Sequence, residues 1–101
     1  MKLLLITAIQ EFEKVIKLIL KKSEVKVYTY KSVMGYKDSS DVSLKDNWFA
    51  SELNERESVI FYAFVPKANV DKVFDLVAEF NEIQETVSHI HLAMLNIEKF
   101  N

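Results

Sequence analysis

The chain has 101 residues and a net charge of −2 at neutral pH, with 13 Lys plus Arg against 15 Asp plus Glu. This length suits one small domain, which we expect to span residues 1–101. A chain that is 50% hydrophobic and 28% charged is neither disordered nor embedded in a membrane. Its acidic balance argues against nucleic acid as a partner. The absence of Cys excludes disulfides and thiolate metal clusters and suits the cytoplasm, where we expect the protein to act without inserting into a membrane.

The first segment of the chain, Met1–Ile9, is mostly apolar, and we predict that it is a buried β-strand. An amphipathic helix is then predicted from Phe12 to Lys22. Its apolar residues recur with helical spacing at Phe12, Val15, Ile16, Ile19 and Leu20. Acidic residues begin this helix and lysines end it, as the helix dipole favours, and Ser23 and Glu24 follow it.

A second strand is predicted from Val25 to about Tyr36, because β-branched and aromatic residues alternate with polar ones there. Gly35, the only glycine in the chain, lies near the end of this strand, where we expect a bulge or a positive φ angle. Residues from about 36 to 57 then lose all periodicity and form a predicted long loop. Loops of this length inside a small domain are uncommon and are usually functional or mobile.

The second half of the chain predicts a strand, a helix and a further strand. The segment Ser58–Val65 is apolar on both faces and ends at Pro66. Apolar residues at helical spacing predict a helix from Asn69, as its N-cap, to about Asn81. A fourth strand is predicted at Thr86–Ile97. The resulting order is that of the ferredoxin-like βαββαβ fold, an α+β fold with a four-stranded antiparallel sheet and two helices on one face.

The predicted first, third and fourth strands are apolar on both faces, whereas a sheet with one face in water normally alternates apolar and polar residues. The first strand carries Leu3 and Leu5 on one face and Leu4 and Ile6 on the other. Whichever set packs on the helices, the other forms a large apolar patch of a kind that is rare on monomers. We therefore expect this face to be buried by self-association.

In segment order and in several short motifs, the chain resembles the PII-like signalling proteins, a superfamily that includes nitrogen regulatory PII and the trimeric divalent-cation-tolerance (CutA) proteins. The resemblance rests on the opening strand Lys2–Ala8, on Val33–Tyr36 before the loop, and on the strand, Pro and helix junction Val65–Val73. It covers nearly the whole chain, and the long loop stands where PII proteins carry their T-loop. The resemblance implies a regulatory homotrimer that binds a small ligand between subunits and a partner, plausibly a membrane transporter, through this loop.

In such a protein the loop flanks and nearby cations would contact an anionic ligand. These residues are Gly35, Tyr36, Lys37, Arg56 and Lys67. PII proteins also close a nucleotide site with a segment rich in Gly and Lys before the last strand. The corresponding segment here, Asn81–Ser88, has neither residue, so a phosphate cradle of that kind is not expected and the ligand stays unidentified.

Two further pairs of residues point to binding. Trp48 and Phe49 lie in the polar loop, where aromatic side chains either anchor a protein partner or fold back onto their own trimer. His89 and His91 project from one face of the predicted fourth strand. They could share a Zn²⁺ or Cu²⁺ ion, which gives an alternative function in divalent metal binding, or they could be polar residues at a subunit interface. We expect no enzyme, because no nucleophile, base and orienting group form a recognisable motif.

Overall fold

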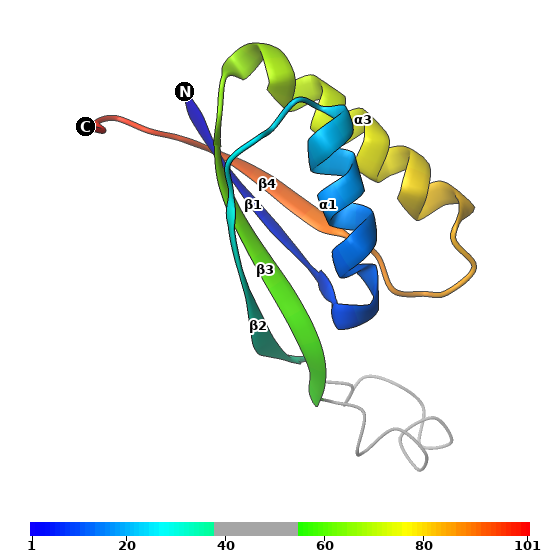
Figure 1. Ribbon diagram of the computed structural model, residues 1–101. Coiled ribbons are helices and arrows are strands. Elements are labelled where there is room, and N and C mark those ends of the chain that lie inside the picture. The colour runs from blue at the N-terminus through cyan, green and yellow to red at the C-terminus, as the bar shows by residue number, and fades with distance from the viewer. Residues whose placement is uncertain (38–54) are drawn as a thin grey trace, which may run out of the picture.

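The computed structural model describes residues 1–37 and 55–101, which form a four-stranded antiparallel sheet covered on one face by two helices (Figure 1). The strands are β1 (Lys2–Ile9), β2 (Thr29–Tyr36), β3 (Glu55–Val65) and β4 (His91–Asn96), and they lie in the order β2-β3-β1-β4. The helices are α1 (Glu13–Lys22), which follows the 3-10 turn η1 (Gln10–Phe12), and α3 (Lys67–Ile83). This is the ferredoxin-like α+β arrangement that the sequence predicts.

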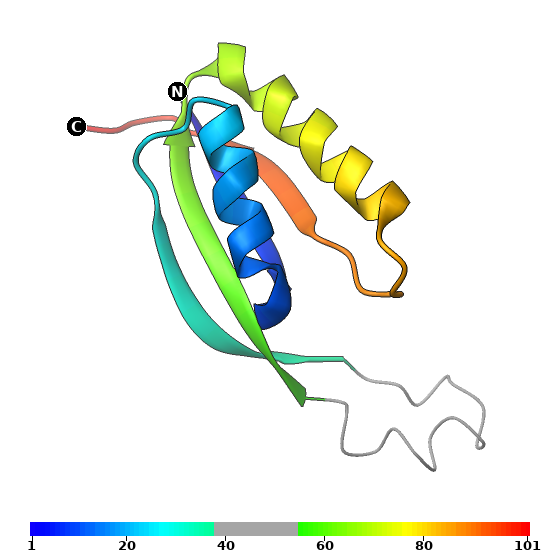
Figure 2. The same cartoon turned by 45° about the vertical axis from the view of Figure 1, so that its right-hand side comes forward.

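The hydrophobic core lies between the sheet and the two helices, which Figure 2 shows side by side on the same face. Alternate residues of the two central strands point into it, as the pleat of a strand requires. They are Leu4, Ile6 and Ala8 of β1 and Val59, Phe61, Ala63 and Val65 of β3. The helices add residues at helical spacing, namely Ile16, Ile19 and Leu20 of α1 and Val70, Val73 and Val77 of α3. The apolar stripe predicted for the first helix is thereby confirmed.

β2 begins at Thr29, later than the predicted start at Val25, and the register of the sheet explains why. Thr29 lies opposite Tyr62 of β3, so continuing the ladder back to Val25 would place that residue opposite Pro66. Pro66 has no amide N–H, and the chain turns there into α3. Val25 is instead buried in the core, at 6% exposure.

α3 begins at Lys67, so the prediction that Asn69 caps this helix is wrong. Pro66 occupies the capping position, and the amide N–H of Asn69 donates to its carbonyl at 2.9 Å. The side chain of Asn69 serves another purpose, since its Nδ2 donates to the carbonyl of Ser23 at 3.0 Å. It thus joins the first turn of α3 to the end of α1.

β4 begins at His91, later than the predicted start at Thr86. Before His91, side-chain amides form hydrogen bonds with backbone N–H and C=O groups that would otherwise pair with a neighbouring strand. Asn81 of α3 accepts a hydrogen bond from the amide of Ile90 at 2.8 Å and donates to its carbonyl at 2.9 Å. Gln84 donates to the carbonyl of Thr86 at 2.7 Å. These contacts hold the segment before β4 in an irregular path. Within the described ranges, no helix is both long and apolar enough to cross a bilayer.

Candidate functional site

The paired ends of β2 and β3 bring four of the predicted ligand-binding residues together. The ladder between these strands continues to its last pair, Tyr36 opposite Glu55, with Gly35 opposite Arg56. Lys37 is the next residue after β2. Because strand pairing fixes both flanks of the intervening segment side by side, the sheet positions these groups at one end of the molecule (Figure 1). β2 extends to Tyr36 and β3 starts at Glu55, so both ends of the loop predicted for residues 36–57 belong to strands.

Gly35 is needed for a close approach between strands. Its φ angle is not positive, so the expected bulge or left-handed turn is absent from this part of β2. A Cβ atom at Gly35 would lie 2.6 Å from Oγ of Ser58, nearer than atoms of neighbouring side chains can come. Oγ of Ser58 in turn donates to the carbonyl of Arg56 at 3.1 Å. The absence of a side chain at Gly35 thus leaves room for Ser58 to donate its hydrogen bond to Arg56. We call this paired end of β2 and β3, next to the segment that joins them, the base of the hairpin.

Arg56, the only arginine in the chain, binds the carboxylate of Glu11 in η1. The hydrogen bond from Arg56 holds the pKa of Glu11 below its usual value, because it favours the charged carboxylate. Both side chains are more than half exposed. The ion pair ties the start of β3 to the turn that follows β1, and an anionic ligand at Arg56 would have to compete with Glu11.

Lys67 does not join this group within one chain. It is the first residue of α3 and follows the opposite end of β3 from Arg56. The strand between them separates the two side chains by roughly 30 Å, at about 3.3 Å for each residue. A Lys67 side chain could therefore reach Arg56 only if the two residues belonged to different subunits.

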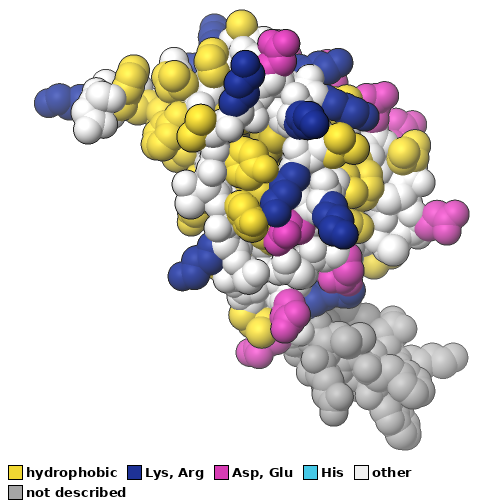
Figure 3. Space-filling model, in the orientation of Figure 1, with side chains coloured by type: hydrophobic (Ala, Val, Ile, Leu, Met, Phe, Trp, Pro, Cys, Tyr) yellow, Lys and Arg dark blue, Asp and Glu magenta, His cyan; other side chains and the backbone are white. Residues whose placement is uncertain are grey.

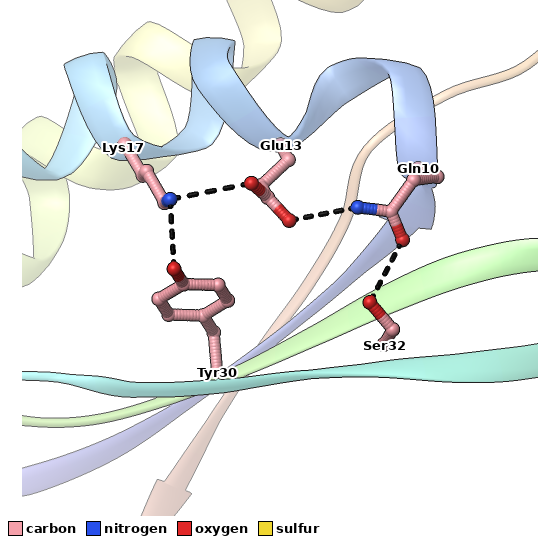
Figure 4. A network of polar contacts seen from close by, with 5 residues as sticks. All are labelled: Gln10, Glu13, Lys17, Tyr30 and Ser32. Atoms are coloured by element: carbon pink, nitrogen blue, oxygen red, sulfur yellow. Dashed lines mark hydrogen bonds and ion pairs between the residues drawn. The ribbon is translucent and has the colours of Figure 1, made fainter.

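A network of polar side chains joins α1 and η1 to β2 (Figure 4). Nζ of Lys17 donates to the hydroxyl of Tyr30 at 3.0 Å and to the carboxylate of Glu13 at 3.2 Å. Gln10 donates to Glu13 at 2.7 Å and accepts a hydrogen bond from Ser32 at 3.2 Å. The contact with Tyr30, followed by that with Glu13, raises the pKa of Lys17. The network fixes the outer strand of the sheet against the helix layer.

Our sequence reasoning missed this network, although one signal for it was present. Gln10, Glu13 and Lys17 are three and four residues apart, which places them on one side of η1 and α1. Their partners Tyr30 and Ser32 are two residues apart, which places both on the same face of a strand. Pairing the two sets requires the order of the strands, which the sequence alone does not supply.

The sheet face opposite the helices is apolar, and no helix or strand within residues 1–37 and 55–101 covers it. The residues on it pair across neighbouring strands, with Leu3 of β1 between Phe64 and Leu95, and Leu5 between Tyr62 and Ala93. Phe64 is 61% exposed and Tyr62 is 42% exposed. The structure thus confirms that β1, β3 and β4 carry apolar residues on both faces. We call this surface the open sheet face, and define it as Leu3, Leu5, Ile60, Tyr62, Phe64, Ala93 and Leu95.

The two histidines lie at the beginning of β4. His91 is its first residue and pairs with Thr7, whereas His89 precedes the strand, so the prediction that both lie in it is wrong. Both side chains are exposed, on either side of the buried Ile90. Among the residues that the structure describes, no group of three or more His, Asp or Glu side chains could hold a metal ion. A metal bound here would need further ligands from beyond the described residues of one chain.

The predicted partner-binding residues Trp48 and Phe49 lie outside the described residues.

The sequence matches no family model and no curated protein, but the fold matches solved structures. A DUF3240 family protein from Shewanella baltica OS155 superposes with a TM-score of 0.67 over 99% of this chain and 92% of its own, at 14% identity. CPII, a nitrogen regulatory PII-like protein from Thiomonas intermedia K12 bound to ADP, AMP and bicarbonate, has a TM-score of 0.61 at 17% identity, over 97% and 94% of the two chains. CPII bound to ADP and bicarbonate has a TM-score of 0.59 at 21% identity, over 93% and 86%. The chain therefore has the fold of the nitrogen regulatory PII-like proteins.

Proposed function

We propose that this chain is a PII-like regulatory protein that assembles as a homotrimer, binds a small anionic ligand between subunits and has no catalytic step. The observation that supports this proposal best is the open sheet face, on a fold shared with PII-like proteins. A contiguous apolar patch that includes large aromatic side chains, such as Phe64 at 61% exposure, is typical of a surface that a partner covers. Association through this face leaves both helices on the outside.

The ligand site would combine groups from two subunits. Gly35, Tyr36, Lys37 and Arg56 gather at the base of the β2–β3 hairpin, whereas Lys67 lies at the far end of β3. A cleft between neighbouring subunits would allow Lys67 of one chain to face the hairpin base of another. CPII is bound to ADP, AMP and bicarbonate in its structures, so these anions are the natural first probes.

Ligand binding would control contact with a protein partner. The segment between β2 and β3 starts at the proposed ligand site, and its sequence carries Trp48 and Phe49, residue types that anchor protein interfaces. We propose a regulated protein as the partner, plausibly a membrane transporter. Replacing residues 38–54 with a short Gly-Ser linker should abolish capture of this partner from cell extract while leaving the trimer intact.

Native mass spectrometry of the purified protein with ADP, AMP and bicarbonate tests the assembly and the ligand together. We expect a trimer that retains nucleotide, and loss of retention in Arg56→Gln and in Lys67→Gln. Because one site would use Arg56 and Lys67 from different chains, mixed trimers of the two variants should recover part of the binding. Lys99→Gln, in the exposed C-terminal segment, is the control and should bind normally. A monomer would refute the proposed assembly. A trimer that binds none of these anions would refute the proposed ligand site.

The same experiment with Zn²⁺ and Cu²⁺ addresses the alternative function in metal binding. His89 and His91 are exposed, but one chain supplies no further ligand among the described residues. Metal retained by the trimer and lost in His89→Ala with His91→Ala would favour this alternative. Equal retention in that variant would exclude these two side chains as ligands.

A further inference from the structure

A groove lined by lysines runs along the outer side of α1, away from the open sheet face. Its volume is about 760 Å³, which is within the range of roughly 300 to 1,000 Å³ that ligand sites occupy. α1 forms one wall and the segment that leads into β2 forms the other. The lining residues are Lys14, Lys17, Leu18 and Lys21 of α1 and Glu24, Val25, Lys26 and Tyr28 of the following segment.

The groove combines an apolar floor with a positively charged rim. Leu18, Val25 and Tyr28 supply apolar surface, and Leu18 is 51% exposed. The rim has four lysines and one glutamate, on a chain whose net charge is −2. Figure 3 shows Lys and Arg side chains grouped around an apolar patch on this side of the molecule. Such a surface is complementary to a partner that is both acidic and apolar.

Most of the lysines on the rim are available for a partner. Lys17 already contacts Glu13 and Tyr30. Lys14 and Lys21 form no ion pair with any residue in 1–37 or 55–101, and neither does Lys26. Their charges therefore stay uncompensated within the described part of the chain.

The shape of the rim distinguishes between kinds of anion. Lys14 and Lys21 are seven residues apart on α1, which separates them by about 10 Å along the helix. One phosphate group is too small to bridge that distance, and a flat bilayer does not enter a groove. An extended peptide advances about 3.3 Å for each residue, so a few residues span the distance between the two lysines. The long, flexible lysine side chains can then reach its carboxylates while apolar residues between them contact Leu18.

We propose that this groove is a docking site for a short acidic peptide segment of a partner protein, in which carboxylates alternate with apolar residues. Lys14, Lys21 and Lys26 would bind the carboxylates, and Leu18 would contact the apolar side chains. The site lies on the helix side of the fold. It therefore neither uses the open sheet face nor depends on the proposed trimer or its ligand.

Fluorescence anisotropy with a labelled eight-residue peptide of alternating Glu and Leu tests this proposal on the full chain. We expect saturable binding that weakens as salt is added, and no binding of the same peptide with Gln in place of Glu. Lys14→Glu with Lys21→Glu should lower the affinity at least about tenfold, since two ion pairs become repulsive. Lys72→Glu with Lys99→Glu is the matched control, because it changes the net charge equally at exposed positions away from the groove.

Additional variants and control ligands show whether the groove itself binds the peptide. Lys21 lies in the last turn of α1, where an acidic residue opposes the helix dipole, so Lys14→Gln with Lys21→Gln provides a milder variant that should also weaken binding. Leu18→Ser should weaken binding without changing its salt dependence. Equal affinity in the groove variants and in the control would overturn the proposal. So would failure to bind the acidic peptide, including the case in which phosphatidylserine vesicles or inorganic phosphate bind in its place.

Discussion

Glu24 has a backbone conformation that most residues avoid. Its φ angle of 61° is the only positive one found for a non-glycine residue in the described chain. The conformation closes α1, since the amide of Val25 then donates to Leu20 at 2.9 Å and that of Glu24 donates to Lys21 at 3.1 Å. The sequence correctly predicts that the helix ends at Ser23 and Glu24. It does not reveal the left-handed residue, because the usual signal for one is glycine.

Replacing Glu24 with glycine should therefore stabilise the protein. A left-handed conformation costs an ordinary residue on the order of 1 kcal/mol, and glycine avoids most of this cost. We expect Glu24→Gly to raise the free energy of unfolding by about 1 kcal/mol in urea titrations. Glu24→Ala removes the carboxylate but keeps the Cβ, so it should give no such gain. Equal stabilisation by both variants would show that the charge, and not the φ angle, is responsible.

At the scale of helices and strands, apolar spacing predicts the type of each element well and its ends poorly. The alternation of buried residues in β1 and the stripe on α1 are visible in the sequence, because burial acts on every residue of the element. The start of β2 depends on where its partner strand stops. The start of β4 depends on Asn81, whose side chain bonds Ile90 from a different element. Such contacts between distant parts of the chain carry no local sequence signal.

The link between η1 and β3 should make stability depend on pH in acid. Arg56 lowers the pKa of Glu11 in the folded protein, so their contact stabilises the fold above the ordinary glutamate pKa of about 4.5. This contribution should fade as the pH falls from the ordinary glutamate pKa through the lowered pKa of Glu11 in the folded protein. We expect Glu11→Gln to be less stable than the natural protein at pH 7, and the difference between them to shrink steadily as the pH is lowered below that ordinary value, as measured by urea unfolding at each pH.

Glu98→Gln is the control for this pH profile, because Glu98 is an exposed residue in the C-terminal segment. It should match the natural protein at every pH. A difference between Glu11→Gln and the natural protein that stays constant from pH 7 to pH 3 would contradict the proposed role of the charged carboxylate.

For the whole molecule, the open sheet face is the feature that the sequence predicts best and the ligand site the one it predicts least completely. A strand that is apolar on both faces indicates a second apolar surface of the sheet, and this pattern can be recognised without knowing which strands pair. The candidate ligand residues were chosen as cations and loop flanks. Strand pairing brings Lys37 and Arg56 together at the hairpin base but leaves Lys67 at the other end of β3. Whether Lys67 comes close to Lys37 and Arg56 depends on how chains assemble, and no short segment of the sequence carries a signal for that.

If the proposed trimer forms through the open sheet face, a charge placed on that face should separate its subunits. Phe64→Glu changes a side chain that is 61% exposed in the single chain, so the fold of the subunit should survive. Association should fail, because each copy loses the burial of one aromatic side chain, roughly 2 kcal/mol, and buries a charge instead. Sedimentation analysis should show a shift from trimer to monomer. Ile83→Glu, at the end of α3 and 77% exposed, is the control and should leave the mass of the assembly unchanged.

The position of β1 in the sheet has a consequence for synthesis of the protein. β1 pairs with both β3 and β4, so Thr7 has partners at Ile60 and His91, both far along the chain. A ribosome that adds about 5 to 20 residues each second releases β1 several seconds before β4 exists. During that interval β1, which is apolar, lacks at least one of the two strands with which it pairs. Folding of the central strand therefore awaits the last part of the chain, and nascent chains that stall before β4 should depend on chaperones.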